Sequence, residues 1–167
     1  MIGRKSAPNK TTPMKKSAKK ISGRRSAGAK ATKKAGPRKS AKVRLSKGPI
    51  WQWSAVETAL AIRSGVISAV EVVEAHLERM RAINPKLNAV VVDFSEEALK
   101  AAKASDKARA KGTELGPLHG VPITIKENVD YEGRPNPNGV AAQMNIIAPS
   151  DAPVVRNLKK AGAIVIA

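Results

Sequence analysis

The sequence predicts an α/β fold for residues 49–167, because two kinds of pattern alternate along that part of the chain. Three short apolar runs are rich in β-branched residues, which is typical of strands buried on both faces. Four other segments open with helix-capping residues or carry apolar residues at helical spacing. The order is helix, helix, strand, helix, strand, helix, strand, which indicates an α/β domain.

The first two helices begin with the same capping device. Ser54-Ala55-Val56-Glu57 and Ser68-Ala69-Val70-Glu71 both have the Ser-x-x-Glu form of a capping box. We expect the first helix to end at Gly65 and the second at Asn84-Pro85. Four residues of the second helix share a helical spacing and should face the core: Val70, Val73, Leu77 and Met80. His76, beside them, is expected to be a boundary residue.

The remaining elements follow from apolar runs and their flanking residues. Residues 88–92 form an apolar run and predict a buried strand. Residues 96–111 predict a helix that Ser95 caps and Gly112 ends. After a loop at residues 133–139, Pro153 opens a further helix, which ends before Gly162. Its apolar side should consist of Val154, Val155 and Leu158. Residues 163–167 predict a last buried strand.

Charge divides the chain into two parts. The 167 residues contain 31 Lys and Arg and 13 Asp and Glu, which gives a net charge of +18. Residues 1–48 hold 17 of the basic residues and no acidic residue, and residues 49–167 hold all the others. We therefore expect a disordered Lys/Arg-rich tail over residues 1–48, because it has too few large apolar residues to form a core. A nearly neutral globular segment should follow over residues 49–167.

The tail has three interpretations, which the sequence leaves open. Its charge density favours an arm that binds nucleic acid without sequence preference. An organelle transit peptide would share the basic, acid-poor composition, although the scarcity of large apolar residues counts against it. The third interpretation is a solvated extension without a function. Basic pairs recur along the tail, at Lys15-Lys16, Lys19-Lys20, Arg24-Arg25, Lys33-Lys34 and Arg38-Lys39.

Several classes of site are not expected. The sequence has no cysteine, so neither a disulfide nor a thiolate-bound metal can form within it. It contains no phosphate-binding loop, dinucleotide fingerprint or zinc-ligand spacing, and we expect no cofactor and no metal. No apolar run of the sequence approaches transmembrane length, and the N-terminus lacks the apolar stretch of a secretory signal. We therefore expect a cytoplasmic protein with no membrane partner.

The central strand of the prediction carries an unusual lysine. In the run Val121-Pro122-Ile123-Thr124-Ile125-Lys126, Ile123 and Ile125 face one side, and Thr124 and Lys126 face the other. One interpretation is an edge strand whose lysine blocks unwanted pairing. The other is a lysine held in a dry site, where burial favours the neutral amine that can accept a proton.

The residues around this lysine form a specific sequence motif. The stretch Gly116-Pro117-Leu118-His119-Gly120-Val121-Pro122-Ile123-Thr124-Ile125-Lys126-Glu127-Asn128-Val129-Asp130 resembles the start of the catalytic core of the amidase signature family, where a Gly-Pro-Leu-x-Gly-Val-Pro motif precedes Lys-Asp-Asn. Ile83-Asn84-Pro85-Lys86-Leu87-Asn88-Ala89 and Asp151-Ala152-Pro153-Val154-Val155 extend the match. The resemblance covers residues 51–166.

This resemblance implies the N-terminal part of a layered α/β/α amidase-signature fold with a mixed sheet. It also implies hydrolysis of the amide C–N bond of a small molecule through a lysine, a bridging serine in a cis peptide and a nucleophilic serine. The lysine corresponds to Lys126, with Thr124 and Asn128 as weaker candidates on the same face. The family uses no histidine, so His119 should be structural or loop-lining. Both serines lie in a Gly/Ser-rich stretch that this sequence does not contain, and we expect a truncated N-terminal segment that is inactive alone.

Two further functions remain open. The chain could act as a nonspecific nucleic-acid-binding protein through residues 1–48. Within the family, it could belong to the subunit type that amidates misacylated transfer RNA together with partner subunits. His119 stands where that type often has a small residue, which disfavours this alternative. Asn136-Pro137 replaces a Thr-Thr pair that many members carry, so the amide substrate is not identified.

Overall fold

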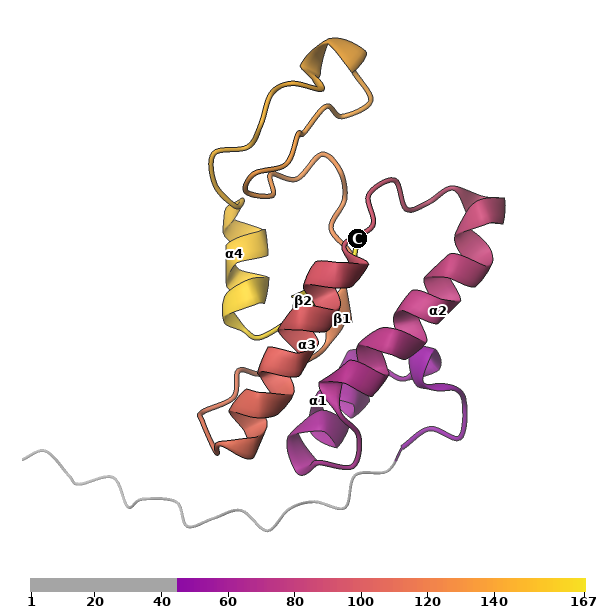
Figure 1. Cartoon of the computed structure of the whole chain (residues 1–167), viewed down its shortest axis with the longest axis vertical. Coiled ribbons are helices and arrows are strands. Elements are labelled where there is room, and N and C mark those ends of the chain that lie inside the picture. The colour runs from indigo at the N-terminus through magenta and orange to yellow at the C-terminus, as the bar shows by residue number, and fades with distance from the viewer. Residues whose placement is uncertain (1–44) are drawn as a thin grey trace, which may run out of the picture. The chain divides into compact units, whose positions relative to one another are not determined.

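The structure, a computed structural model, describes residues 45–167 (Figure 1). The predicted basic tail therefore lies almost wholly outside the described residues. Within these described residues the α-helices are α1 (Ala55–Ser64), α2 (Ala69–Leu87), α3 (Ser95–Ala110) and α4 (Pro153–Lys160). The strands are β1 (Pro122–Ile123) and β2 (Ile164–Val165), and the short 3-10 turns are η1 (Ile50–Gln52) and η2 (Ala141–Gln143). The predicted α/β class is confirmed for this part of the chain.

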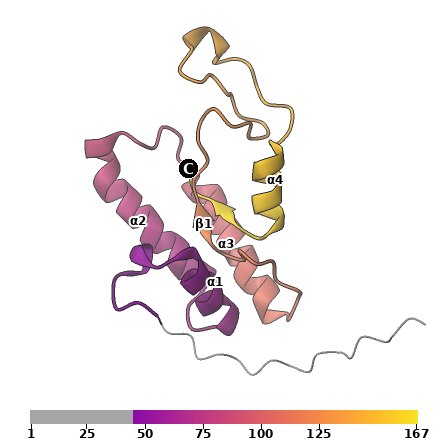
Figure 2. The same cartoon turned by 180° about the vertical axis from the view of Figure 1, so that it is seen from behind.

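The sheet joins two of the three predicted strands, the one that leads to Lys126 and the one at residues 163–167. β1 and β2 run parallel, with Pro122 opposite Ile164 and Ile123 opposite Val165. Beyond the register pairs, the amide of Ile125 donates to the carbonyl of Ala167 at 2.9 Å. Figures 1 and 2, which view the molecule from opposite sides, place α3 across one face of this pair. The sheet thus holds the segment that leads to Lys126 against the helices.

The predicted strand over residues 88–92 is wrong. This segment is an irregular connection between α2 and α3, and Val91 in it is 65% exposed. The physical reason is local, because the Asn84 side chain captures the backbone that a sheet would need. Its Nδ2 donates to the carbonyl of Val90 at 2.9 Å, and its Oδ1 accepts from the amide of Val90 at 2.9 Å. The apolar run remains, but its backbone does not join the sheet.

The capping predictions for α1 and α2 are confirmed. Both Ser54 and Ser68 accept a hydrogen bond from the backbone of the glutamate three residues later, and the side chain of that glutamate accepts one in return from the backbone of the serine. Gly65 ends α1 with φ of 75°, in the left-handed region that favours glycine. The predicted end of α2 at Asn84-Pro85 is wrong. Pro85 lies in the last turn, where its missing N–H removes one hydrogen bond, and the helix ends at Leu87, followed by the cap residue Asn88 with φ of 50°.

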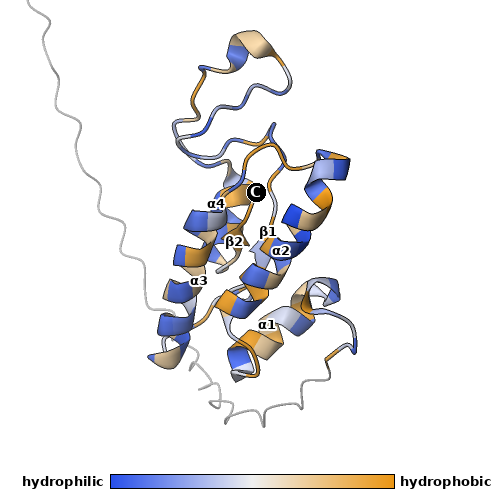
Figure 3. Cartoon of the chain, turned by 45° about the vertical axis from the view of Figure 1, so that its right-hand side comes forward, coloured by the Kyte–Doolittle hydropathy of each residue, from blue (hydrophilic) through white to orange (hydrophobic). Residues whose placement is uncertain are grey.

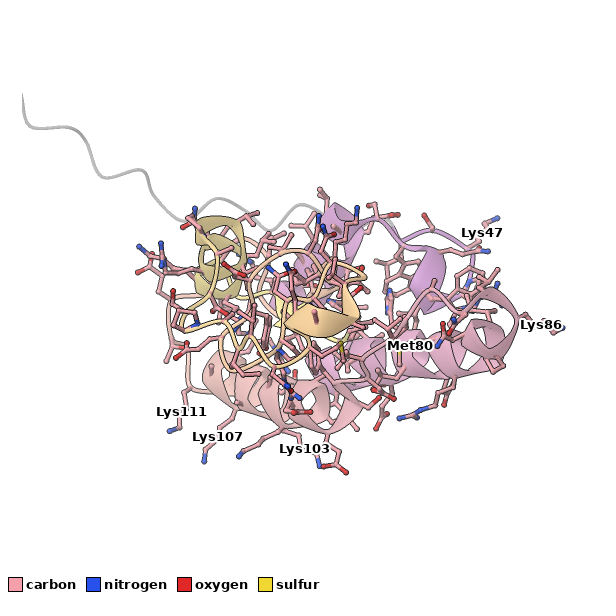
Figure 4. The ribbon with its side chains drawn as sticks, turned by 90° about the horizontal axis from the view of Figure 1, so that it is seen from above. Lys47, Met80, Lys86, Lys103, Lys107 and Lys111 are labelled. Atoms are coloured by element: carbon pink, nitrogen blue, oxygen red, sulfur yellow. The ribbon has the colours of Figure 1, made fainter. Side chains whose placement is uncertain are left out.

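Helix α3 supports the start of α2 through a carboxylate. Asp106 accepts hydrogen bonds from the amides of Ala69 at 2.8 Å and Val70 at 3.1 Å. These amides belong to the first turn of α2, where backbone donors have no partner within the helix. The opposite side of α3 is polar, and Lys103 and Lys107 extend away from the body of the molecule (Figure 4). The predicted helix over residues 96–111 is confirmed, and it is amphipathic. The predicted cap is wrong, because Ser95 is the first residue of the helix and its hydroxyl donates to the carboxylate of Asp93 instead of capping the helix.

The core lies between α1, α2, α3 and the sheet. Both α2 and α3 carry apolar and polar residues around their circumference, as Figure 3 shows by colour. Of the predicted core positions in α2, Val73 and Leu77 are fully buried, whereas Val70 and Met80 are partly buried against the cluster. The buried cluster consists of Ile62, Ala69, Val72, Val73, Leu77, Ala98, Ala102, Ile164 and Ile166.

Helix α4 begins at Pro153, as predicted, and one of its predicted core residues is misplaced. Val155 is fully buried, but Val154 is 54% exposed. The two side chains are adjacent on a helix and therefore point in directions about 100° apart, so one buried neighbour does not imply another. Gly162 follows the helix with φ of 92°, in the left-handed region.

Within residues 45–167, no helix has the length and apolar character that a membrane crossing requires.

Candidate functional site

The loop before β1 is fixed by the turn that leads into β2. The amide of Leu118 donates to the carbonyl of Ala161 at 2.9 Å, and the amide of Gly120 donates to the carbonyl of Gly162 at 2.9 Å. Gly116 approaches this turn so closely that a Cβ atom would lie 2.3 Å from the Ala161 carbonyl oxygen. The glycines of the motif therefore serve close backbone packing, which sets where β1 begins.

His119 is buried in this loop. Its side chain is 8% exposed, and Nε2 lies 3.1 Å from the carbonyl oxygen of Ser105 in α3. This contact ties the loop to α3 and agrees with the structural role predicted for the residue. His76 is half-buried on α2, where Nδ1 lies 2.8 Å from the carbonyl oxygen of Val72, as expected of a boundary residue.

Lys126 follows β1 at the end of the sheet. Ile125 before it still pairs with Ala167, and the carbonyl of Lys126 accepts from the amide of Val129 at 2.9 Å, which starts a turn. Ile125 and Lys126 thus mark the point where the extended backbone gives way to a loop. The side chain of Lys126 is exposed and reaches solvent.

A cavity of about 490 Å³ opens beside this lysine. Thr124 and Lys126 both line it, so the structure brings these two predicted residues together. Its wall is mainly apolar and comes from three segments, with lining residues Val91, Val92, Phe94, Val129, Tyr131 and Ala167. A smaller cavity of about 220 Å³ shares Thr124 with the first and extends toward Trp51 and Met80. A polar group near Lys126 and an apolar group along the wall could occupy the larger cavity together.

The predicted position of Asn128 is wrong. The extended backbone ends before it, because residues 127–129 form a turn, and the period of two does not continue. Among the described residues that line the two cavities, Asn128 is absent, and its carbonyl faces the side chain of Asn136 at 3.5 Å. The structure therefore does not join Asn128 to Lys126 and Thr124.

Two aromatic residues of the cavity wall were not predicted as part of the site. The rings of Phe94 and Tyr131 stack with centroids 5.2 Å apart. The guanidinium of Arg134 lies 4.8 Å from the Phe94 centroid, and the same arginine pairs with Glu97 at 2.8 Å. These residues are far apart in sequence, so no local pattern could identify them. Their aromatic character was the available signal, since few residues of the chain are aromatic.

The loop after Lys126 is anchored to α4 by one carboxylate. Asp151 accepts hydrogen bonds from the amide of Glu132 at 3.0 Å and from Nζ of Lys159 at 2.9 and 2.8 Å. Nζ of Lys159 also lies 3.8 Å from the centroid of Tyr131. The amide of Ala152 donates to the carbonyl of Asp130 at 2.9 Å. The segment between the lysine and the cavity wall is thereby held in place.

Electrostatics strengthen this anchor. Burial acts to raise the pKa of Asp151, but the hydrogen bonds from Lys159 and from the amide of Glu132 outweigh it and lower the pKa. Burial likewise acts to lower the pKa of Lys159, and the hydrogen bond to Asp151 and the negative charge of that carboxylate raise it instead. Both groups therefore stay ionised at neutral pH. Within residues 45–167, no cluster of three or more His, Asp or Glu side chains is placed to hold a metal.

Comparison with known proteins gives one consistent result. A family sequence model described as Amidase matches residues 71–167. An indoleacetamide hydrolase from Bradyrhizobium diazoefficiens is 82% identical over 120 residues, which cover 72% of this chain and 23% of that protein. The human fatty-acid amide hydrolase 2 is 37% identical over 123 residues, covering 70% of this chain and 23% of that protein. A glutamyl-tRNA(Gln) amidotransferase component from Streptomyces coelicolor is 40% identical over 113 residues, which cover 68% of this chain and 23% of that protein.

Solved structures agree with the sequence relatives. A fatty acid amide hydrolase superposes with a TM-score of 0.67 at 32% identity, covering 70% of this chain and 21% of that chain. A peptide amidase from Stenotrophomonas maltophilia superposes with a TM-score of 0.64 at 30% identity, and the match covers 71% of this chain and 24% of that chain. The chain therefore spans about a quarter of the length of the proteins it matches, at their N-terminal end.

Proposed function

The chain belongs to the amidase family, and on that basis we propose that it supplies the lysine-bearing N-terminal part of an enzyme that hydrolyses the C–N bond of a small-molecule amide. The observation that carries the proposal is the place of Lys126. It follows β1 by three residues, within the motif of residues 116–130, and borders the larger cavity together with Thr124. A cytoplasmic location belongs to the same proposal.

Lys126 is assigned the role of a general base. In its neutral form, its amine accepts a proton from a hydroxyl group, either the attacking one or one that relays the proton. The hydroxyl oxygen then attacks the amide carbonyl, ammonia or an amine leaves, and water releases the acid. Such an amine must be shielded from water, because solvent favours the ammonium form. Lys126 is exposed in this part of the fold, so the role requires further protein to cover it.

The substrate that we favour is a primary amide attached to an arylalkyl group. The relative at 82% identity is named for indoleacetamide, which is an amide of this class. The wall of the larger cavity offers matching chemistry, with the aromatic pair Phe94 and Tyr131 and the apolar side chains of Val91 and Val92. Flat apolar groups are held well by such surfaces.

A test of this proposal requires the part of an amidase that residues 45–167 do not supply. In a completed chimera, residues 45–167 replace the matched segment of the Bradyrhizobium indoleacetamide hydrolase, which 82% identity makes feasible. Ammonia release is measured from indole-3-acetamide, a long-chain fatty amide and glutamine. The proposal expects the highest kcat/KM for indole-3-acetamide. Preference for glutamine would instead support the transfer-RNA amidotransferase type, and turnover of none of the three would contradict the proposal.

The tail carries a second proposed function. Residues 1–48 hold 17 basic residues and no acidic one, a composition that favours contact with nucleic-acid phosphates. This binding would be independent of base sequence and of the amidase part.

A further inference from the structure

A row of lysines follows the outer side of helix α3. Lys100, Lys103, Lys107 and the cap residue Lys111 are three or four residues apart, and this spacing places them on one side of the helix. All of them are exposed. Figure 4 shows Lys103, Lys107 and Lys111 extending in a common direction, away from the body of the molecule. We call these residues the α3 lysine row.

Positive charge is concentrated in this part of the chain. Residues 100–111 contain five basic residues and one acidic residue, whereas the rest of residues 49–167 contain nine basic and twelve acidic residues. The acidic residue in this segment is Asp106, which lies on the other side of the helix and accepts hydrogen bonds from the amides of Ala69 and Val70. The α3 lysine row is therefore a positive strip on a segment that is otherwise slightly acidic.

The charges of the row have no ion-pair partner within residues 45–167. The ion pairs of this part of the chain are Arg134 with Glu97 and Lys159 with Asp151. Like charges three or four residues apart destabilise a helix. The helix dipole offsets this repulsion in the last turn, but Lys103 lies farther from that end. Glu96 stands on the same side one turn before Lys100, so the uncompensated part of the row begins at Lys103.

The side chains of the row and its surroundings indicate the class of partner. A lysine ammonium is a point charge on a flexible stem, which suits phosphates but not the paired geometry that reads a base edge. The exposed residues between the lysines include Ala101 and Ala104, and no large apolar or aromatic side chain is there to enter a lipid bilayer. The apolar side of α3, with Ala98 and Ala102, is buried in the core. The row thus fits a series of phosphates.

We propose that the α3 lysine row is a second nucleic-acid contact of this chain, which binds the phosphates of a duplex without sequence preference. It goes beyond residues 1–48, the site already proposed for such binding, and it does not depend on amidase activity. None of its lysines lines the two cavities near Lys126. Because both contacts belong to one chain, binding at one raises the effective concentration of phosphates at the other.

The experiment uses the completed chimera with residues 1–44 restored ahead of it, so that α3 belongs to an enzyme of full length. Lys103→Gln combined with Lys107→Gln is the row variant. Lys86→Gln combined with Lys160→Gln is the control variant, which removes the same charge at exposed positions of α2 and α4. Glutamine and lysine have similar helix propensities, so α3 is retained. Fluorescence anisotropy of a labelled duplex of random sequence measures binding over a range of salt concentrations.

The row variant should bind the duplex more weakly than the parent does. The slope of log affinity against log salt should fall by about two, because each phosphate contact contributes about one. The control variant should keep the parental slope. Equal slopes for the two variants would overturn the proposal, and so would a parent that does not bind the duplex. Displacement of the duplex by polyglutamate or by phosphatidylserine vesicles as readily as by unlabelled duplex would also overturn it, in favour of an acidic protein or a membrane.

Lysine acetylation adds a positional measurement on the parent chimera. Bound duplex should slow acetylation at Lys103 and Lys107 several-fold, as read by mass spectrometry, and should leave the rates at Lys86 and Lys160 unchanged. Unchanged rates at Lys103 and Lys107 in a complex that forms would contradict the proposal.

The two nucleic-acid contacts are separated by removing residues 1–44. Affinity that falls on this removal and falls again in the row variant supports both contacts. Affinity that falls on removal but is the same in the row variant and the parent overturns the α3 lysine row and leaves the proposal for the tail intact. Affinity that depends on the row alone supports the α3 lysine row and contradicts the proposal for the tail.

Discussion

Lys159 donates to both carboxylate oxygens of Asp151, at 2.9 and 2.8 Å, and this pair fixes the loop that follows Lys126. The side chain of Asp151 is only 12% exposed, whereas that of Lys159 is 35% exposed. In the completed chimera, Lys159→Met should weaken the local structure by about 1 kcal/mol, after allowance for solvent screening. Hydrogen exchange at the amide of Glu132, which donates to Asp151, should rise by about fivefold.

Lys160→Met is the matched control for this substitution, because Lys160 is the exposed neighbour on the same helix. Its effect on exchange at Glu132 should be small. Lys159→Arg should restore protection, since a guanidinium can form the same paired hydrogen bonds. Equal exchange in the Met and parent forms would show that the ion pair does not hold the loop.

Glu57 predicts a pH dependence for the start of α1. Hydrogen bonds from Ser46 and Ser54 lower its pKa from 4.5 to about 2. A carboxyl group whose pKa falls on folding stabilises the fold fully above its unfolded pKa, and the effect is lost as pH falls through the folded pKa. In the completed chimera, the parent should melt at a higher temperature than Glu57→Gln at pH 6, and the difference should shrink between about pH 5 and 2. A difference that is constant with pH would exclude ionisation of Glu57 as its source.

Residues 1–48 should bind duplex DNA of random sequence. With 17 positive charges, a dissociation constant of roughly 10⁻⁶ to 10⁻⁴ M is expected near physiological salt. The affinity should fall steeply with added salt, because phosphate contacts release counter-ions. Fluorescence anisotropy of a labelled duplex compares the full chain with residues 49–167. Equal binding by the two at low salt would rule out the tail as the binding element.

The 167-residue chain alone should release no ammonia from simple amides. One candidate hydroxyl, that of Ser95, is engaged elsewhere, because it donates to the carboxylate of Asp93. The exposed apolar side chains of Leu87, Val91 and Val92 should also prevent a cooperative thermal melt, since burial of apolar surface drives cooperative folding. An ammonia assay and a melt of residues 49–167 check both statements. Turnover that Lys126→Ala abolishes would contradict the first, and a cooperative melt of a monomer would contradict the second.

Local signals account for the parts of the fold that the sequence predicts well. Ser54 and Ser68 each lie three residues before a glutamate, so both capping boxes are visible in the sequence and both form. The motif predicts Lys126 as the catalytic lysine, and the structure adds only its position three residues after β1. These predictions depend on residues within a few positions of one another.

Side-chain contacts that composition does not reveal account for the failures. The run at residues 88–92 has the composition of a strand, but Asn84 binds the backbone of Val90, and composition alone does not reveal this. The stack of Phe94 on Tyr131 joins two residues from separate segments, so no spacing rule predicts it. The cavity wall beside Lys126 depends on that stack, which is why the sequence predicts the lysine but not its surroundings.

The proposed role of Lys126 as the proton acceptor of an amide hydrolase is tested most directly by kcat/KM of the completed chimera for indole-3-acetamide. Lys126→Ala should lower this value by at least about 10²-fold, the smaller end of the range for a positioned acid–base group. Lys126→Arg should be nearly as damaging, because a guanidinium does not release its proton in this pH range. An arginine variant that retains the parental kcat/KM would contradict the account and leave Lys126 as a surface charge beside the strand.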